Sequence, residues 1–274
     1  MVASAADPAL PIGVFDSGVG GLTVLRALRR RLPGESFLYL GDTARLPYGS
    51  KSPETVARYA EQAARILVDR GIKALVIACN TASAVALQPL TRRFAPLPVI
   101  GVVEPGAEAA CQASISGRIL VIATEGTVRG GAYERAIRAR RPDAAVISTP
   151  CPLFVALAEE GWVDGPIVEA VARRYLGPCL REEIDCLVLG CTHFPVLGPA
   201  LAAVTGPGVR LVDSAESTAR VVEARLTDTG LLAAAPAAAP PRLLATDAPQ
   251  RFGRVGAVFL GEAIAPEGVE LVDL

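Results

Sequence analysis

Two cysteines in equivalent sequence contexts are the residues of this chain best suited to chemistry. Cys79 follows the apolar run 74–78, Cys191 follows the run 186–190, and the only histidine, His193, lies two residues after Cys191. Apolar runs of this length are typical of buried strands in a parallel sheet. Ligands of such sheets bind beyond the carboxyl ends of the strands. We therefore expect both thiols to face a ligand site.

Two thiols that face one cavity can form a disulfide, bind a metal or act as a proton-transfer pair. The first ten residues carry Asp7 and no basic segment, so we expect a short disordered extension, no signal peptide, and a cytoplasmic protein. Cytosolic thiols stay reduced, which disfavours a disulfide. A single histidine and the lack of Cys-x-x-Cys spacing disfavour a metal site.

Proton transfer is the interpretation we favour. It requires a thiolate on one side and a thiol on the other, and the ordinary cysteine pKa of ~8.5 makes this state accessible near neutral pH. Such a pair can remove a proton from one face of a carbon acid and return one to the other face. The sequence therefore predicts inversion at carbon with no cofactor and no metal. The four remaining cysteines are expected to be ordinary core or surface residues.

Polar residues near the two cysteines suit supporting roles. Asp16 can orient and deprotonate Cys79, and His193 can do the same for Cys191. Four more side chains, together with backbone N–H groups at helix starts, are suited to hold carboxylates: Ser17, Asn80, Thr81 and Thr192. A lone aspartate before a glycine loop is often a turn residue, and a lone histidine is often structural. Their paired occurrence at matching strand ends favours the functional interpretation.

The glycine-rich loop at 16–21 invites comparison with a phosphate-binding loop. Gly18, Gly20 and Gly21 do not have the Gly-x-Gly-x-x-Gly spacing. Asp16 opens the loop, and its carboxylate would repel a phosphate. We therefore disfavour a nucleotide site.

The overall composition disfavours two functions, nucleic-acid binding and membrane insertion. The 274 residues carry a formal charge of −1 with a pI near 6.0, so the chain lacks the basic footprint of a protein whose primary ligand is nucleic acid. Hydrophobic residues make up 51% and the mean hydropathy is +0.40, yet no stretch reaches the ~18–20 apolar residues of a membrane span. We expect no membrane association.

Alternating apolar runs and helical patterns predict a doubly wound α/β architecture. Strands are expected at 12–15, 36–40, 74–78, 99–103, 118–123, 144–148, 186–190 and 209–212, with a strand-like run at 257–260. Helices are expected at 22–31, 53–70, 83–94, 133–140 and 167–180, with another that ends near 226. The Ala/Pro segment 233–241 has linker composition, typical of a surface loop.

The spacing of these elements indicates an internal repeat. Asp16 precedes Cys79 by 63 positions, and Thr124 precedes Cys191 by 67. In each half, a loop follows a first strand and a cysteine ends a later one. We therefore predict two similar domains with parallel sheets, related by pseudo-twofold symmetry, with the active site in the cleft between them.

Four motifs resemble the signatures of bacterial glutamate racemases, within the aspartate/glutamate racemase family. They are Phe-Asp-Ser-Gly-Val-Gly-Gly at 15–21, Pro-Tyr-Gly at 47–49, Cys-Asn-Thr-Ala-Ser at 79–83 and Gly-Cys-Thr-His-Phe-Pro at 190–195. The resemblance covers nearly the whole chain, including 151–154 with Glu159 and the segment 246–252. Only the segment 233–241 and the first residues depart from the family pattern.

This resemblance implies cofactor-independent interconversion of L- and D-glutamate, which supplies D-glutamate for peptidoglycan. Cys79 and Cys191 would alternate as proton donor and acceptor, Asp16 would assist Cys79, and His193 with Glu159 would assist Cys191. The implied substrate contacts are Asp16, Ser17, Tyr48, Gly49, Asn80, Thr81, Thr127, Thr192 and His193. The implied domains are 1–102 with 211–274, and 103–210. The resemblance also implies a homodimer.

Two other functions are compatible with the pattern. Relatives of the same fold act on aspartate or hydantoins, but the aspartate enzymes resemble this pattern with an acid where His193 stands, which favours glutamate. Some family members bind DNA gyrase, and a non-catalytic relative could keep only that role. Retention of both thiols and their partners disfavours a purely binding protein.

Overall fold

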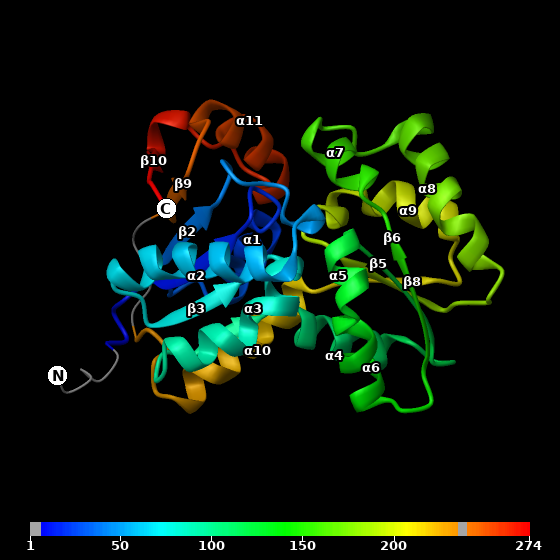
Figure 1. The fold of residues 1–274 in the computed structure, drawn as a ribbon, viewed down its shortest axis with the longest axis horizontal. Helices are drawn as coiled ribbons and strands as arrows, with labels where there is room; N and C mark the ends of the chain where they lie inside the picture. The colour runs from blue at the N-terminus through cyan, green and yellow to red at the C-terminus, as the bar shows by residue number, and fades with distance from the viewer. Residues whose placement is uncertain (1–6, 235–239) are drawn as a thin grey trace.

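Two parallel β-sheets organise the chain and lie side by side (Figure 1). The computed structural model describes residues 7–234 and 240–274. The predicted disordered extension falls largely on residues 1–6, and much of the predicted surface loop falls on 235–239, so both lie outside the described residues. Among the described helices, none combines the length and the apolar character required to cross a bilayer.

The first sheet has six strands in the order β10-β9-β2-β1-β3-β4, and all its pairings are parallel. Its strands are β1 (Ile12–Asp16), β2 (Phe37–Gly41), β3 (Ala74–Ile77), β4 (Val99–Gly101), β9 (Arg242–Ala245) and β10 (Val269–Leu271). Ile12 and Val14 enter the core on one face, and Phe15 enters a second core on the other face. Burial on both faces explains why β1 and β3 read as continuous apolar runs.

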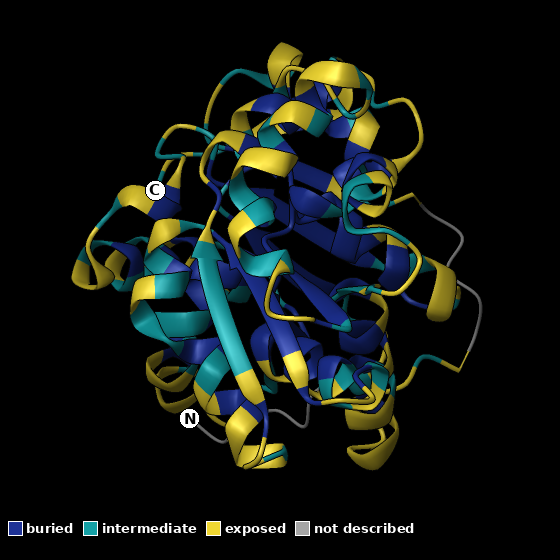
Figure 2. Cartoon of the chain, turned by 90° about the vertical axis from the view of Figure 1, so that its right-hand side faces the viewer, coloured by how far each residue is buried: buried dark blue, intermediate teal, exposed yellow. Residues whose placement is uncertain are grey.

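The second sheet has four parallel strands in the order β6-β5-β7-β8. They are β5 (Arg118–Ala123), β6 (Ala145–Pro150), β7 (Cys186–Gly190) and β8 (Arg210–Asp213). Figure 2 shows this side of the molecule, where β5 and β7 are buried and the edge strand β6 is partly exposed. This order repeats the order β2-β1-β3-β4 of the first sheet. The predicted α/β fold with parallel sheets is confirmed.

Helices cover both faces of each sheet. Around the first sheet lie α1 (Leu22–Arg31), α2 (Pro53–Asp69), α3 (Asn80–Arg93), α10 (Ala215–Asp228) and α11 (Pro249–Leu260). Around the second lie α4 (Val103–Ala113), α5 (Glu125–Gly130), α6 (Ala132–Arg140), α7 (Leu153–Glu159), α8 (Gly165–Leu180) and α9 (Gly198–Thr205). Three short 3-10 turns complete the described elements: η1 (Tyr48–Ser50), η2 (Phe194–Leu197) and η3 (Pro266–Gly268).

Local sequence signals set several helix starts. Ser52 caps α2 by accepting a hydrogen bond from the Thr55 N–H at 3.3 Å, and Pro53 occupies the first helical position. Thr124 caps α5 in the same way through the Thr127 N–H. Cys79 caps α3, so the thiol lies at the junction between β3 and that helix. The fold thus fixes one candidate catalytic thiol by its capping position.

Four sequence predictions need correction. The apolar run 257–260 lies in α11 and is not a strand, because Phe252, Val255 and Phe259 are buried at helical spacing. The predicted strand 99–103 ends at Gly101, since Val103 already starts α4. The helix expected at 83–94 begins three residues earlier, at Asn80. Six further elements were not expected: α4, α5, α7, α9, β9 and β10. The predicted division at 210/211 falls inside β8, which pairs with β7 in the second sheet.

A buried ion pair ties distant segments to the first sheet. Lys73 and Glu35 form this pair with side chains that are 0% and 2% exposed. The Lys73 ammonium also donates to the Pro8 carbonyl at 2.6 Å, and the Glu35 carboxylate accepts from the Ala233 N–H at 2.8 Å. The pair therefore joins the start of the described chain, the α1–β2 connection and the segment before β9.

We predict that Lys73→Met lowers the free energy of unfolding by about 3–5 kcal/mol, because Glu35 would keep a buried charge without its partner. Urea denaturation followed by circular dichroism measures this change. Lys51→Met, at the only other lysine, should change the unfolding free energy by less than about 0.5 kcal/mol. If Lys73→Met lowers the free energy of unfolding no more than Lys51→Met does, the ion pair does not stabilise the fold as proposed.

Candidate active site

Both cysteine thiols line one cavity between the two sheets. Cys79 follows β3 and Cys191 follows β7, and these strands occupy equivalent places in the two sheets. The cavity has a volume of about 30 Å³. The other lining residues are Ser17, Gly18, Leu46, Pro47, Tyr48, Gly49, Asn80, Thr81, Thr124, Val155, Glu159, Thr192 and His193. Of the residues predicted from sequence, the structure gathers all at this cavity except Asp16 and Thr127, which lie behind it.

Cys79 is a buried thiol with two hydrogen-bond partners. Its Sγ accepts from the Ala82 N–H and donates to the Ser17 hydroxyl, both at 3.5 Å. Burial raises the pKa of Cys79 to about 12, and the nearby Asp16 carboxylate adds to the effect. Cys79 is therefore a neutral thiol at neutral pH, able to donate a proton.

Asp16 is fully buried beneath the glycine loop. Its Oδ2 accepts from the Gly18 N–H at 2.9 Å, and its Oδ1 has no partner among the described residues. Burial raises the pKa of Asp16, although the charge of His193 opposes the shift. In the described residues Asp16 makes no hydrogen bond to Cys79, because Ser17 occupies that position. In this conformation Asp16 could therefore assist Cys79 only through the electrostatic effect of its carboxylate, and not through a hydrogen bond.

Cys191 belongs to a chain of three groups, in which Cys191 and His193 are buried and Glu159 is partly buried. Its Sγ lies 3.8 Å from Nδ1 of His193, and Nε2 of His193 lies 3.1 Å from Oε1 of Glu159. Burial alone would lower the pKa of His193, but interactions with Cys191 and Glu159 raise it to about 10. Burial would raise the pKa of Glu159, but His193 and Arg251 lower it. At neutral pH an imidazolium therefore lies beside the Cys191 sulfur.

Tyr48 is fixed by a polar cluster that sequence reasoning missed. Its hydroxyl donates to Oδ2 of Asp42 at 2.5 Å, and the same carboxylate accepts from Arg45 Nε at 2.7 Å and from Thr246 Oγ1 at 3.0 Å. Burial and Asp42 raise the pKa of Tyr48, so it stays a neutral donor. Asp42 directly follows β2, just as Asp16 ends β1. An acidic residue at the end of a second strand was therefore a sequence signal that could have identified Asp42.

Residues of the two sheets also meet through hydroxyl and amide groups. Thr81 Oγ1 lies 2.9 Å from Thr124 Oγ1 and 3.2 Å from Thr127 Oγ1. Thr127 is buried behind these two hydroxyls. The Tyr133 hydroxyl donates to Asn80 Oδ1 at 2.7 Å, and Asn80 Nδ2 has no partner in the described part of the chain. These contacts hold α3 against the second sheet and fix the side chain of Asn80.

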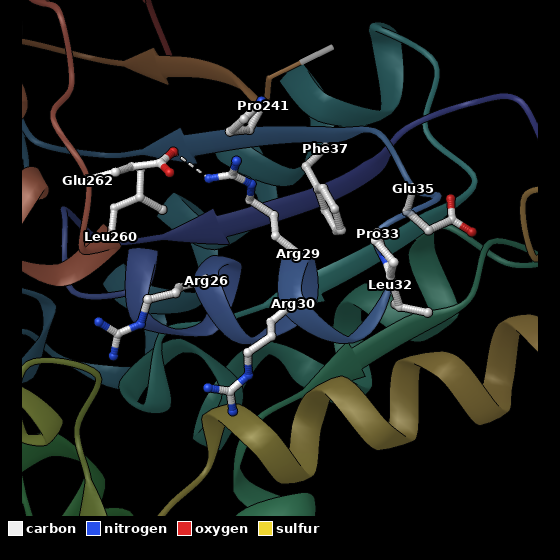
Figure 3. Close-up of a pocket in the computed structure, with 10 residues that line it drawn as sticks. All are labelled: Arg26, Arg29, Arg30, Leu32, Pro33, Glu35, Phe37, Pro241, Leu260 and Glu262. Carbon is white, nitrogen blue, oxygen red and sulfur yellow. Dashed lines mark hydrogen bonds and ion pairs between the residues drawn. The ribbon is translucent and has the colours of Figure 1, made fainter. Parts of the chain in front are cut away.

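A larger cavity elsewhere in the described part of the chain lacks the side chains that the predicted proton transfer would require. A cavity of about 400 Å³ near the amino end of β2 is lined by Arg26, Arg29, Arg30, Glu35 and neighbouring residues, with no cysteine or histidine (Figure 3). Two of its arginines are already paired with acids, Arg29 with Glu262 and Arg30 with Glu216. Within residues 7–234 and 240–274, no three His, Cys, Asp or Glu side chains are grouped as a metal site.

Comparison with known proteins identifies the family. The model of the Asp/Glu/Hydantoin racemase family matches residues 12–222. This chain belongs to that family. A glutamate racemase of Geobacter metallireducens is 50% identical over 250 residues, which cover 91% of this chain and 92% of that protein. The resemblance predicted from the motifs is confirmed.

Two solved glutamate racemases share the fold of this family member. The Francisella tularensis enzyme in complex with D-glutamate has a TM-score of 0.90 at 38% identity, with 97% of this chain and 98% of that chain covered. The Thermus thermophilus enzyme in complex with β-chloro-D-alanine has a TM-score of 0.88 at 47% identity, with 98% of each chain covered. The two-domain arrangement expected from the sequence is therefore the arrangement of this family.

Gly20→Ala should abolish most activity without unfolding the protein. A Cβ at Gly20 would lie 2.4 Å from His193 Nδ1 and 2.5 Å from Thr192 Oγ1, so the imidazole would be displaced. A displacement of about 1 Å can cost on the order of 100-fold in rate. Turnover assays beside Gly208→Ala, where a Cβ meets open space, measure the effect. Equal activity of the two variants would contradict the packing described.

Stability should depend on pH through His193. Its pKa is raised to about 10 in the folded protein, against ~6.5 in an unfolded chain. The stabilisation is therefore complete below pH ~6.5 and is lost as the pH rises toward the folded value. We predict that the difference in unfolding free energy between wild type and His193→Gln is largest near pH 6 and shrinks by pH 10. Urea titrations at several pH values test this, and a constant difference would contradict it.

Proposed function

We propose that this protein is a glutamate racemase that interconverts L- and D-glutamate without a cofactor. The observation that carries the proposal is the presence of two thiols, at equivalent strand ends of two sheets, in a single cavity. The named relatives support glutamate as substrate, since one is a glutamate racemase at 50% identity and one solved neighbour holds D-glutamate. The protein is then an isomerase that acts on an amino acid.

The different surroundings of the two thiols support a two-base mechanism. Cys79, whose pKa is raised to about 12, would donate a proton to Cα. Cys191 lies beside the His193 imidazolium and would act as the base. Cys191 would remove the α-proton from one face while Cys79 protonates the other face. The reverse reaction would use the same groups in opposite roles, so each turnover inverts the carbon.

Unpaired polar atoms support recognition of an amino acid. Asn80 Nδ2 can donate to a substrate carboxylate, and the Asp16 carboxylate, which lies behind the cavity in this conformation, would accept from the α-ammonium once the cavity expands. Hydroxyl groups of Ser17, Thr81 and Thr192 surround the same space, together with Tyr48 and Gly49. We assign these residues to substrate binding, with Thr127 as support for Thr81 and Thr124.

Binding would require the cavity to expand. Its volume of about 30 Å³ is far below the ~300 Å³ of a usual small-molecule site. We propose that two domains separate to admit glutamate: residues 1–102 with the C-terminal segment, and the segment from 103 through β8. The boundary would fall after Asp213, since β8 belongs to the second sheet.

The cellular role would follow from this activity. Production of D-glutamate would serve peptidoglycan synthesis in a bacterial cytoplasm.

We also propose a homodimer, for which exposed apolar side chains such as Trp162 (53% exposed) and Ile167 (54% exposed) offer a contact surface. Light scattering at several concentrations would test that state, and a monomer at all of them would contradict it.

The activity is tested by circular dichroism of L- and D-glutamate solutions that contain the purified protein and EDTA. Wild type should bring both enantiomers to the same racemic end point. Cys79→Ala and Cys191→Ala should each lose at least about 100-fold in turnover, because each removes one of the two proton carriers. Cys186→Ala is the matched control, since this thiol lies in β7 and does not line the cavity.

Other outcomes would redirect the proposal. Turnover of aspartate or a hydantoin, with glutamate inert, would retain the mechanism and change the substrate. Full racemisation by either single cysteine variant would contradict the two-thiol mechanism. No turnover of any of these compounds would favour a binding role, such as that of the gyrase-binding relatives.

A further inference from the structure

Helix α11 contacts the Cys191–His193–Glu159 chain at two points, although it packs on the other sheet. Arg251 forms an ion pair with Glu159, with its Nη2 2.9 Å from Oε2. Phe259, two turns further along α11, packs edge-on against the His193 ring with centroids 5.1 Å apart and planes at 73°. Figure 1 shows α11 and α7, which carries Glu159, side by side. One helix thus supports both the imidazole and its carboxylate partner.

The two oxygens of Glu159 have separate partners. Oε1 faces His193 at 3.1 Å, and Oε2 faces Arg251 at 2.9 Å. The Glu159 side chain is only 12% exposed, whereas Arg251 is 44% exposed and reaches inward from the surface. Glu160, at 61% exposed, lies 3.8 Å from the other Arg251 nitrogen and does not extend to His193. Arg251 therefore fixes the rotation of the Glu159 carboxylate.

The cavities around Glu159 place this contact at the edge of the site. Glu159 and Leu46 line the small central cavity and also two outer cavities, of about 340 and 190 Å³. Arg251 lines the second of these, together with Asp247. The charged groups around Glu159 are thus His193 after β7, Arg251 on α11, Asp247 just before α11 across the shared outer cavity, and the adjacent Glu160 just after α7.

We propose that Arg251 is a positioning residue for racemisation, which holds the Glu159 carboxylate against His193 from the opposite domain. The inference rests on the proposed function, in which His193 serves Cys191. Because Arg251 and Glu159 belong to different sheet units, the contact exists only while α11 lies against α7. Assembly of the Cys191 half of the site is therefore coupled to closure of the cleft.

Kinetics of Arg251→Gln, Arg251→Lys and two controls test the proposal. Arg254→Gln removes the same charge one turn along α11, and Arg254 has no ion-pair partner among the described residues. Glu160→Gln removes the exposed acid next to Glu159. We expect Arg251→Gln to lower kcat about tenfold or more with KM within about twofold, since it impairs proton transfer and not substrate binding. Arg251→Lys keeps the positive charge and should retain most of the wild-type kcat. Both control variants should have the kcat and KM of wild type.

The pH profile separates positioning from a structural role. Loss of Arg251 removes a charge that favours the ionised form of Glu159, so the acid limb of kcat should move up by about half a pH unit or more. The controls should leave that limb in place. Equal kcat and an unmoved acid limb in Arg251→Gln would overturn the proposal, whatever the stability of the variant.

A second readout does not depend on activity. His193 is the only histidine, so its imidazole resonances can be titrated by NMR in untagged protein without ambiguity. The pKa of His193 should fall by about half a unit or more in Glu159→Gln, which removes its anionic partner, and stay unchanged in Arg254→Gln. It should also fall in Arg251→Gln, because displacement of the Glu159 carboxylate outweighs the small rise that loss of a nearby cation alone would cause. An unchanged His193 titration in Arg251→Gln would refute the inference even if glutamate is racemised. A shifted titration in a protein inert on glutamate would uphold the contact and reject the proposed function.

Discussion

The proposed chemistry depends on placing two chemically identical side chains in different electrostatic surroundings within one cavity. Both thiols are buried, and burial alone favours the neutral form of a thiol. Cys79 has only hydrogen-bond partners and a nearby carboxylate, so it remains protonated. Cys191 has an imidazolium beside it, which is in turn stabilised by the partly buried Glu159 carboxylate. The asymmetry therefore comes from what surrounds each sulfur and not from the sulfurs themselves.

The duplicated strand order explains how this asymmetry can arise from a symmetric frame. Strands β2-β1-β3-β4 and β6-β5-β7-β8 place Cys79 and Cys191 at equivalent ends of two sheets. The segments around the repeat then differ. Asp16 ends β1, whereas Thr124 follows β5 and caps α5, and helix α11, which packs on the first sheet, contacts His193 and Glu159. Two similar halves thus supply a common geometry, and the unmatched segments supply the charges.

The chemistry-bearing residues could be predicted from sequence where they stand next to a strand end. Cys79, Asn80, Cys191, Thr192 and His193 all follow apolar runs, and the carboxyl ends of parallel strands meet at one edge. Glu159, Tyr48 and Thr127 were reached only through family resemblance, because no local pattern links them to the cysteines. The structure brings Glu159 to His193 and Tyr48 to the cavity, and places Thr127 behind Thr81.

The residues that were missed act across long sequence separations. Arg251 and Glu159 are 92 positions apart, and Asp42 and Thr246 are 204 apart. Their contacts depend on how α11 and the β9 connection pack, which no periodicity in the chain encodes. The same segment produced the wrong strand at 257–260, since four apolar residues fit either a strand or one side of a helix. Only the spacing of Phe252, Val255 and Phe259 distinguishes the two.

The central claim is that two different thiols handle the proton on the two faces of Cα. Racemisation of L-glutamate in D₂O, with proton NMR of both enantiomers during the first turnovers, tests it most directly. The account predicts that newly formed D-glutamate carries deuterium at Cα, because its proton comes from a solvent-equilibrated thiol, while unreacted L-glutamate stays protonated. Retention of the substrate's own α-proton in the D-glutamate product would show that a single group moves it, and would contradict the account.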